Sequence, residues 1–284
     1  MNKTTTLNNN SHLSQQPNAL GITKRVRVLN GIFDHVTLRE TTDWATQWIK
    51  SGYRGYICTV NVAILMMMRS NRRLQKFVDQ AALVVADGKP IVWSSQWLTS
   101  GLPERVTGID LIDALAERAE QEKFGIYLLG ASREVIEQTA KNLQKKHPQL
   151  EICGINDGYF SSSQVAERVS LIRQSGAQIL LVGMGVPKQE YFLEENWSEL
   201  GVNLAIGVGG SFEVIAGKKL RAPQWVQETG LEWLYRLLQE PQRLWKRYLV
   251  TNLQFIYHLL LCLAFSSKKE RVSQPTEKAS SLPQ

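Results

Sequence analysis

Residues 179–190 read Ile-Leu-Leu-Val-Gly-Met-Gly-Val-Pro-Lys-Gln-Glu and contain the pattern that decides the fold. The apolar run Ile179–Val182 predicts a buried strand. A helical pattern follows from about Gln189, and Pro187 stands near its first turn, where a missing N–H costs no hydrogen bond. A strand, a glycine-rich turn and a helix in this order are typical of a βαβ unit.

The same alternation extends in both directions from this segment, over about residues 26–220. Strands are predicted at Arg27–Leu29, Asp34–Thr37, Gly55–Val60, Leu83–Ala86, Ile126–Leu129, Leu150–Ile155, Ile179–Val182 and Leu204–Val208. Helices are predicted at Glu40–Ser51, Val62–Gln80, Gly108–Glu122, Glu134–Lys146, Ser163–Ser175 and Gln189–Glu199. This spacing predicts an α/β fold, a Rossmann-like and mainly parallel sheet with helices on both faces, to which a helical C-terminal appendage is added.

Composition divides the chain of 284 residues into four parts. Residues 1–25 are rich in Asn, Ser, Thr and Gln and predict a disordered tail, with no apolar segment of the kind a signal peptide needs. An α/β catalytic domain is expected over 26–220, a basic aromatic appendage over 221–265, and a second disordered tail over 266–284. Three cysteines without a metal or disulfide spacing favour a reduced, cytoplasmic location.

The net charge of +7 lies at the ends of the chain. Residues 36–220 hold twenty charges of each sign, whereas residues 221–271 hold eight Lys and Arg against four Glu, a net charge of +4. A nucleic-acid binder more often carries its basic stripe on the body, so a nucleic-acid partner is not expected. A basic segment beside many aromatic residues favours anionic lipid headgroups or phosphates.

The appendage places four cations along neighbouring helical faces: Arg236, Arg243, Lys246 and Arg247. The apolar stretch Leu253–Phe265 is about 13 residues long, shorter than the roughly 20 that a spanning helix needs. An interfacial helix at a membrane surface is therefore expected. The alternative is an ordinary helical cap whose tryptophans pack on the body.

Polar or glycine-rich residues follow the predicted strands, where open α/β sheets bind ligands. Asp87 comes directly after Leu83–Ala86 and suits a general base, or else the cap of the next helix. Thr59 and Asn61 flank another strand end and suit sugar hydroxyls or a base edge. Asn61 suits a helix N-cap equally well.

Glycine turns at three further strand ends predict close approach of the backbone to a ligand. Gly185 precedes Lys188, Gln189 and Glu190 at a helix start, where free N–H groups favour an anion such as a pyrophosphate. The other two turns contain Gly130 and the pair Gly209 and Gly210. Arg105 stands just before a predicted helix and is a further candidate for phosphate binding.

Several common patterns are absent from the sequence. Neither the G-x-G-x-x-G fingerprint nor the Walker pattern occurs, which weakens a dehydrogenase or NTPase interpretation. No Asp-x-Asp pair occurs, and the four histidines lie away from the strand ends. The sequence offers no metal or cofactor motif. If the chain is a transferase, its phosphate charge has to be met by Arg, Lys or helix N-termini.

In combination these segments resemble the WecG/TagA/CpsF family of glycosyltransferases (glycosyltransferase family 26), over roughly residues 26–249. The resemblance rests on Thr59-Val60-Asn61, Ala86-Asp87-Gly88, Glu104 to Gly108, Gly185 to Glu190, Gly207 to Gly210, Arg221-Ala222-Pro223, and Gly230 to Arg236 with Pro241 and Arg243. Two positions depart from the usual pattern: Glu213, where the family more often has Asp, and Lys89-Pro90, where smaller or apolar residues are commoner.

The resemblance implies an inverting, metal-independent transfer from a UDP-sugar, typically of N-acetylmannosamine type, to a polyprenyl-diphosphate-linked sugar at the inner face of the cell membrane. It implies that Asp87 is the catalytic base and that Thr59, Asn61, Arg105 and Gln189 line the site. Arg236, Arg243 and Arg247 or Lys246 would meet the lipid diphosphate. Two alternatives are a Rossmann-like nucleotide-binding oxidoreductase and a non-catalytic membrane-associated binding module, and a homo-oligomer is open.

Overall fold

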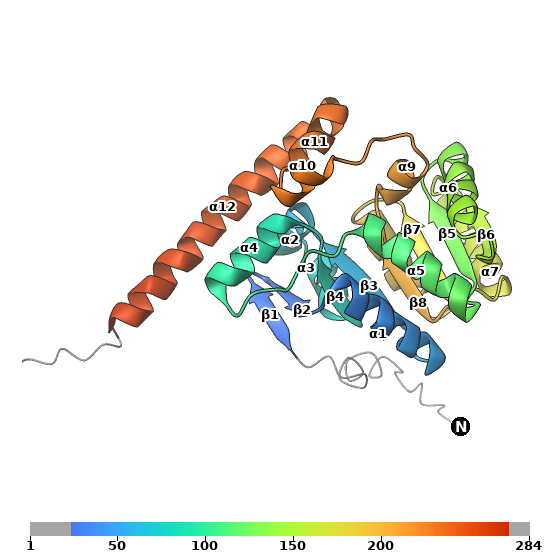
Figure 1. The fold of residues 1–284 in the computed structure, drawn as a ribbon, viewed down its shortest axis with the longest axis horizontal. Coiled ribbons are helices and arrows are strands. Elements are labelled where there is room, and N and C mark those ends of the chain that lie inside the picture. The colour runs from blue at the N-terminus through green and yellow to red at the C-terminus, as the bar shows by residue number, and fades with distance from the viewer. Residues whose placement is uncertain (1–23, 273–284) are drawn as a thin grey trace, which may run out of the picture.

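The computed structural model describes residues 24–272 and is built around one parallel sheet (Figure 1). The sheet has six strands in the order β4-β3-β8-β7-β5-β6, and all neighbouring strands pair in parallel. The strands are β3 (Gly55–Val60), β4 (Leu83–Ala86), β5 (Ile126–Gly130), β6 (Ile152–Asn156), β7 (Ile179–Gly183) and β8 (Leu204–Gly207). The predicted α/β class and parallel sheet are confirmed.

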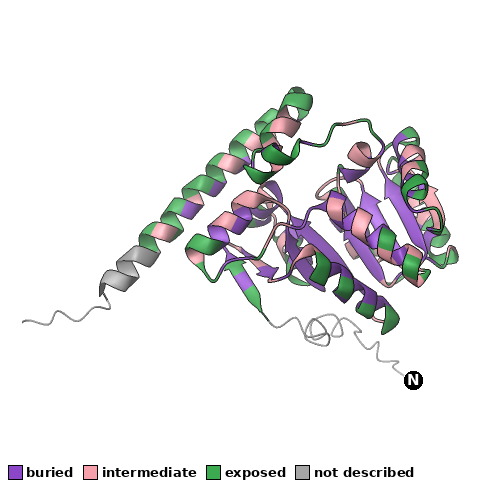
Figure 2. Ribbon diagram, in the orientation of Figure 1, coloured by how far each residue is buried: buried purple, intermediate pink, exposed green. Residues whose placement is uncertain are grey.

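The central strands are apolar throughout because helices cover both of their faces. Every residue of β3, β4, β5 and β7 is buried, and Figure 2 shows the sheet as the buried centre of the molecule. Continuous apolar runs of this kind are what a doubly covered parallel sheet requires.

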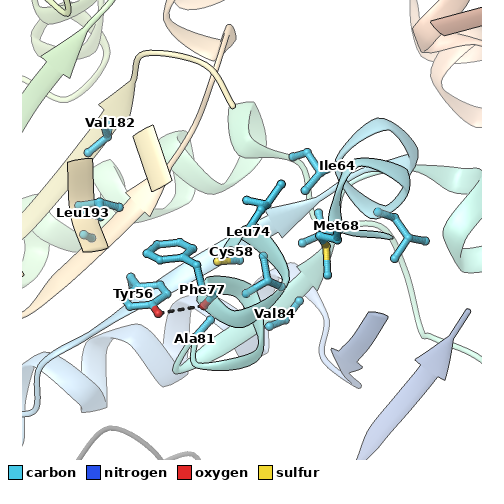
Figure 3. Close-up of a cluster of buried hydrophobic side chains, with 14 of the residues drawn as sticks. Tyr56, Cys58, Ile64, Met68, Leu74, Phe77, Ala81, Val84, Val182 and Leu193 are labelled. Atoms are coloured by element: carbon cyan, nitrogen blue, oxygen red, sulfur yellow. Dashed lines mark hydrogen bonds between the residues drawn. The ribbon is translucent and has the colours of Figure 1, made fainter. Parts of the chain in front are cut away.

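Two groups of helices cover the two faces of the sheet. One core cluster joins the sheet to α2 (Val62–Ser70), α3 (Arg72–Asp79), α7 (Val165–Gln174, preceded by the 3-10 turn Ser162–Gln164) and α8 (Lys188–Asn196). The other joins it to α1 (Leu38–Lys50), α5 (Gly108–Glu122), α6 (Arg133–Lys146) and α9 (Ser211–Ile215). Figure 3 shows part of the first cluster, where Tyr56 stacks on Phe77 with ring centroids 4.2 Å apart.

A two-stranded antiparallel hairpin lies beside the edge strand β4. It consists of β1 (Arg25–Val28) and β2 (Gly31–Asp34). The buried carboxylate of Asp34 accepts a hydrogen bond from the Val84 backbone N–H (2.8 Å) and from Arg25 (2.8 Å). The hairpin thus satisfies part of the open edge of the sheet. A strand pair was predicted here. Strand β1 begins two residues and ends one residue earlier than predicted, and β2 begins and ends three residues earlier.

Two further differences from the sequence prediction concern helices. The predicted helix over 62–80 is two helices, because Asn71 ends α2 and its side chain accepts a hydrogen bond from Leu74 N at the start of α3. Helix α4 (Lys89–Leu98) was not predicted. Its sequence begins Lys-Pro and contains two adjacent serines, so it lacks a regular apolar period.

The C-terminal arm consists of three helices: α10 (Gln224–Glu228), α11 (Glu232–Gln239) and α12 (Pro241–Val272). Helix α12 packs against α2, α4 and α11, with Leu244, Phe255 and Leu259 buried, and its far end projects beyond the body (Figure 1). The helix ends at Val272 rather than at the predicted boundary of Phe265. The predicted disordered tails are residues 1–25 and 266–284. Positions 1–23 and 273–284 lie outside the described residues, whereas Arg25 begins β1 and residues 266–272 continue α12.

Over Pro241–Phe265, helix α12 is long and apolar enough to cross a membrane by length and composition alone. From the sequence, only the 13 residues of Leu253–Phe265 were counted as apolar. The apolar surface of the helix begins earlier, because it includes residues such as Leu249 and Val250. Length and composition do not distinguish a spanning helix from an interfacial one, and one side of α12 is packed on the body.

The connections leaving two neighbouring central strands diverge. Strand β3 leads into α2 on one face of the sheet, whereas β8 leads into α9 on the other. A crevice forms outside the carboxyl ends of strands at such a switch point. The residues that follow β3, β7 and β8 are therefore brought together.

Candidate active site

A polar cavity of about 130 Å³ lies at this switch point. One side of the cavity is formed by residues at the ends of β3, β7 and β8, and the opposite side by residues of the arm. Of the predicted site residues, the cavity is lined by Thr59, Asn61, Asp87, Gly185, Gln189, Gly209, Gly210, Arg236, Arg243 and Arg247. Residues far apart in the sequence, from body and arm, thus share one cavity.

Thr59 and Asn61 both line the cavity, and both also have structural partners. The Thr59 hydroxyl donates to the Gly207 carbonyl on the neighbouring strand (3.1 Å). The Asn61 side chain accepts from Ile64 N (3.1 Å) and caps α2. The cap interpretation of Asn61 is confirmed, and the cap itself lies in the cavity wall.

Gln189 is buried and fixed by two hydrogen bonds. Its Oε1 accepts from Gly209 N (3.1 Å), and its Nε2 donates to Oε1 of Glu190 (2.8 Å). A Cβ atom at Gly207 would lie only 2.5 Å from Gln189 Nε2, so a side chain there would displace the Gln189 amide. Burial raises the pKa of Glu190 to about 7, and among the described residues its Oε2 has no partner.

The arm supplies the three arginines of the polar cavity, and the body contributes Lys219. Burial alone would lower the pKa of Arg236, but the carboxylates of Asp87 and Glu232 raise it. Arg243 is held by Glu240, with bonds of 2.9 and 2.5 Å, and Glu240 also pairs with Lys219 (2.7 Å). Sequence reasoning did not identify Lys219 and Glu240, which have no motif around them and meet only when the arm folds back.

A second cavity, of about 320 Å³, is mainly apolar and lies between α4 and the arm. Its apolar lining comes from Val62, Ala63, Pro90, Trp93, Trp97, Trp233, Phe255, Ile256 and Leu259. Its polar residues include Arg105, which sequence reasoning placed in the site without distinguishing two cavities. Four residues line both cavities: Asn61, Asp87, Arg236 and Tyr248.

Asp87 is therefore positioned where the polar and apolar cavities meet. Its backbone N–H donates to the Val60 carbonyl (2.9 Å), which fixes it at the end of β4. The N-cap of α4 is Gly88, and no side chain caps that helix, so the alternative that Asp87 is a cap is wrong. Within the described residues 24–272, its carboxylate has no hydrogen-bond partner.

The electrostatic surroundings of Asp87 suit a base near neutral pH. Burial is the largest effect and raises the pKa of Asp87 to about 6. Arg236 and Arg105 lower this pKa, whereas Glu232 and Asp110 raise it. A carboxylate with a pKa in this range is ionised near pH 7 and is still basic enough to accept a proton from a reacting hydroxyl.

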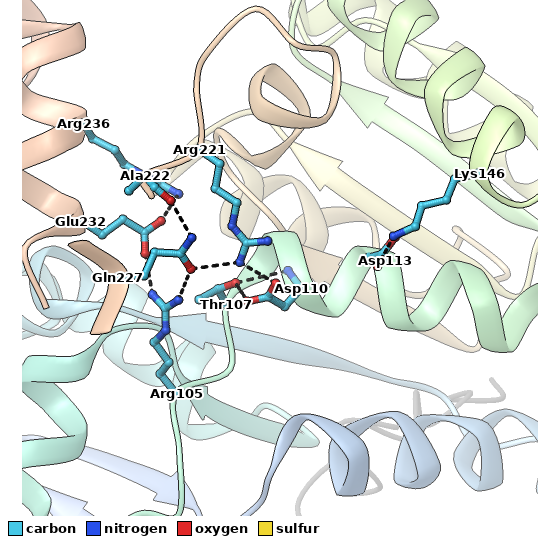
Figure 4. Close-up of polar contacts among 10 residues, drawn as sticks. All are labelled: Arg105, Thr107, Asp110, Asp113, Lys146, Arg221, Ala222, Gln227, Glu232 and Arg236. Atoms are coloured by element: carbon cyan, nitrogen blue, oxygen red, sulfur yellow. Dashed lines mark hydrogen bonds and ion pairs between the residues drawn. The ribbon is translucent and has the colours of Figure 1, made fainter. Parts of the chain in front are cut away.

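Glu232 joins the two arginines nearest to Asp87 (Figure 4). Its carboxylate lies 2.5 Å from Nη1 of Arg105 on the body and 3.3 Å from Nη2 of Arg236 on the arm. Gln227 accepts a further bond from Arg105, and Arg221 pairs with Asp110 (2.5 Å). The arm is thus held to the body by ion pairs directly beside the candidate base.

Four predicted residues, all in the described part of the chain, line neither of these two cavities: Gly130, Lys188, Glu190 and Lys246. A Cβ at Gly130 would lie 2.5 Å from the Gly183 backbone, so packing between strands explains this glycine. Lys188 donates to the Gly158 carbonyl (2.7 Å), Glu190 is buried beneath Gln189, and Lys246 is exposed. Both departures from the family pattern are at the site: Glu213 lines the polar cavity, and Lys89 and Pro90 line the apolar one.

Comparisons with known proteins place the chain among glycosyl transferases. The model of the glycosyl transferase WecG/TagA/CpsF family matches residues 26–269. A protein of Bacillus spizizenii, N-acetylglucosaminyldiphosphoundecaprenol N-acetyl-beta-D-mannosaminyltransferase, is 32% identical over 205 residues. The match covers 72% of this chain and 78% of that protein.

Proposed function

The chain belongs to the WecG/TagA/CpsF family of glycosyl transferases, and from this premise we propose that it transfers an N-acetylmannosamine-type sugar from a UDP-sugar to a polyprenyl-diphosphate-linked sugar. One observation carries the proposal: Asp87 lies where a polar cavity with cations meets an apolar cavity. Membership of a transferase family replaces the two alternatives of an oxidoreductase and a non-catalytic binding module.

The donor diphosphate is assigned to the polar cavity. Backbone at Gly185 and Gly210 borders this cavity, so a phosphate can approach the main chain closely there. Arg243 and Arg247 face the same space from the arm. The resemblance assigned these arginines to the lipid diphosphate. Their place in the polar cavity favours the UDP diphosphate instead.

The acceptor is assigned to the apolar side of Asp87. Arg105 and Arg236 line the end of the apolar cavity that Asp87 shares. A diphosphate bound there contacts the arginines, and a lipid chain attached to it contacts the apolar side chains of the same cavity. The relative from Bacillus spizizenii is named for an acceptor of this class, a diphosphoundecaprenol-linked N-acetylglucosamine.

In the proposed reaction, Asp87 removes the proton from an acceptor hydroxyl as that oxygen attacks the anomeric carbon of the donor. The bond between this carbon and the UDP oxygen breaks on the opposite side, and configuration inverts. Arg236 and Arg243 stabilise the charge that develops on the leaving UDP. Residues 24–272 gather no group of three or more His, Cys, Asp or Glu that could hold a metal, and the proposed reaction assigns the phosphate charge to arginines.

We assign the enzyme to the inner face of the cell membrane as a peripheral protein. Exposed apolar side chains run along α12, including Leu249, Leu253, Ile256 and Leu260. Lys246 and the neighbouring Trp245 are exposed on the same helix. A helix packed on the body along one side and apolar along the other suits an interfacial position beside anionic headgroups.

The test is turnover of Asp87→Asn with a UDP-N-acetylmannosamine donor and a lipid-diphosphate-linked N-acetylglucosamine. Loss of the general base is expected to lower kcat by about 10²-fold or more, while UDP binding is retained. Asp113→Asn is the matched control, because Asp113 pairs with Lys146 away from both cavities. Transfer by Asp87→Asn at the rate of the Asp113→Asn control would disprove the assignment.

A further inference from the structure

The second cavity is lined mainly by apolar side chains, and we propose that it binds the first isoprene units of the acceptor's lipid chain. The proposal rests on the proposed function and names the part of the acceptor that this cavity selects. Its walls come from three elements: Trp93 and Trp97 on α4, Trp233 on α11, and Phe255, Ile256 and Leu259 on α12. Body and arm thus each contribute part of the wall.

The cavity has the polarity of an amphiphile with an anionic head. Two carboxylates and three cations line it: Asp87, Glu232, Lys89, Arg105 and Arg236. Most of the remaining lining is aromatic or aliphatic. A soluble sugar phosphate would satisfy the arginines and leave the tryptophans uncovered. A diphosphate that carries an apolar chain satisfies both ends, since burial of apolar surface stabilises the complex.

The exposure of the lining side chains indicates where the chain leaves the cavity. Phe255 and Leu259 are buried, whereas Trp97 is 61% and Ile256 is 52% exposed, so the last two form the rim. Helix α12 continues past this rim with the exposed Leu260 and Phe265, and its far end projects beyond the body (Figure 1). The lipid chain therefore leaves along the same apolar surface that is assigned to the membrane.

The contact between arm and body is shaped to close this cavity. Gly230 has φ +67°, and a Cβ atom there would lie 2.6 Å from the Trp93 ring. A glycine without a side chain allows the turn before α11 to rest directly on Trp93. The aromatic wall and the arm are therefore fitted to each other rather than separated by an open gap.

The experiment varies only the lipid part of the acceptor. Transfer is measured with the full chain and with acceptors of one, two or three isoprene units on the same sugar diphosphate, below the concentrations at which they form micelles. Wild-type kcat/KM is expected to rise about tenfold or more from one unit to three, because each added carbon is buried. Trp97→Ala and Ile256→Ser are expected to lose most of this rise with chain length.

Trp225→Ala is the control, because Trp225 is 65% exposed and lines neither of the two cavities. It is expected to keep the wild-type dependence on chain length. Because Trp97 and Ile256 are also exposed, their substitution is compatible with folding.

Two results would overturn the cavity assignment while leaving the proposed function intact. One is transfer by the wild type at a rate independent of chain length, as expected if the cavity holds a bilayer lipid. The other is an equal loss by Trp97→Ala on all chain lengths. Absence of transfer to every acceptor by the wild type would overturn the proposed function as well.

Discussion

The body and the arm of this protein are built in opposite ways. The body is electrically neutral over residues 36–220, and its central strands are buried on both faces. The arm is basic, and α11 has no buried residue at all within the described structure. The body is held by its apolar core, whereas the arm is held on the body by one side of α12 and by ion pairs.

The two regions supply different parts of the site. Asp87, Thr59 and Gln189 are fixed by backbone hydrogen bonds and strand ends of the body. Arg236, Arg243 and Arg247 come from the arm. The comparison teaches that the base is positioned by the core of the fold, whereas the three arginines of the polar cavity are present only when the arm is docked.

Removal of the arm is expected to have the largest effect. A chain ending after Leu220 keeps the sheet and Asp87 but loses the three arginines of the polar cavity, and transfer is expected to fall by about 10³-fold or more. Binding to anionic liposomes, measured by flotation, is expected to disappear. A chain ending after Val272 is the control and is expected to keep both properties.

One result of this truncation would contradict the claim that the arm supplies part of the site. If circular dichroism shows a folded body and that body still transfers sugar at near wild-type rate, the arm supplies no part of the site. Unchanged flotation would separately contradict the membrane assignment.

Substitution of one arm arginine tests the comparison more finely. Arg236→Ala is expected to lower kcat/KM by about 10²-fold, because Arg236 lines both cavities beside Asp87. Arg236→Lys is expected to recover part of this loss, since it restores the charge without the planar guanidinium. Lys246→Ala is expected to change transfer to a soluble acceptor by less than about twofold, because Lys246 is exposed and lines neither cavity.

A comparison of Arg236→Ala with Lys246→Ala tests whether the position of a cation within the arm matters for the rate of transfer. Equal losses from both alanine variants on a soluble acceptor would show that net charge, rather than position in the cavity, determines the rate.

A smaller effect than that of Arg236→Ala is expected from Glu232→Gln, at the contact between arm and body. The negative charge of Glu232 raises the pKa of Asp87, so its removal lowers this pKa from about 6. The acid-side fall of kcat/KM, which marks protonation of Asp87, is therefore expected at lower pH than in the wild type. At the optimum the loss is expected to be below about tenfold, since one hydrogen bond to a charged group contributes about 1.5 kcal/mol.

Glu228→Gln is the control for this pH profile, because Glu228 is exposed and, within residues 24–272, its carboxylate accepts only from Gln224. A shift of the acid limb to higher pH in Glu232→Gln would contradict the sign of the interaction. An unchanged limb would show that Asp87 is not the group that titrates.

The sequence predicts the sheet well because the central strands are continuous apolar runs. Ile179–Gly183 and Gly55–Val60 stand out in this way, and polar residues follow them at the site. Asp87, Thr59 and Gln189 could be selected because a parallel sheet brings the ends of its strands together. These predictions depend only on local pattern and on a general rule of topology.

The division of the site residues between a polar and an apolar cavity could not be predicted from local sequence pattern. Arg105 lines the apolar cavity, and Arg243 and Arg247 line the polar one, because the arm folds back across the crevice. That arrangement depends on contacts between residues more than a hundred positions apart, such as Arg105 with Glu232. The tryptophans of α4 were missed for a related reason, since that helix has no regular apolar period and its inner face is completed by α12.

The position of Asp87 between two unlike cavities has a consequence for how the enzyme meets its substrates. On the proposed function, the donor arrives by diffusion through a volume, and the acceptor arrives by lateral diffusion within a sheet of lipid. The rate then depends on the concentration of one substrate per litre and of the other per unit of membrane area. Diluting the acceptor with inert lipid, at constant total amount, would slow such an enzyme as surely as removing its donor.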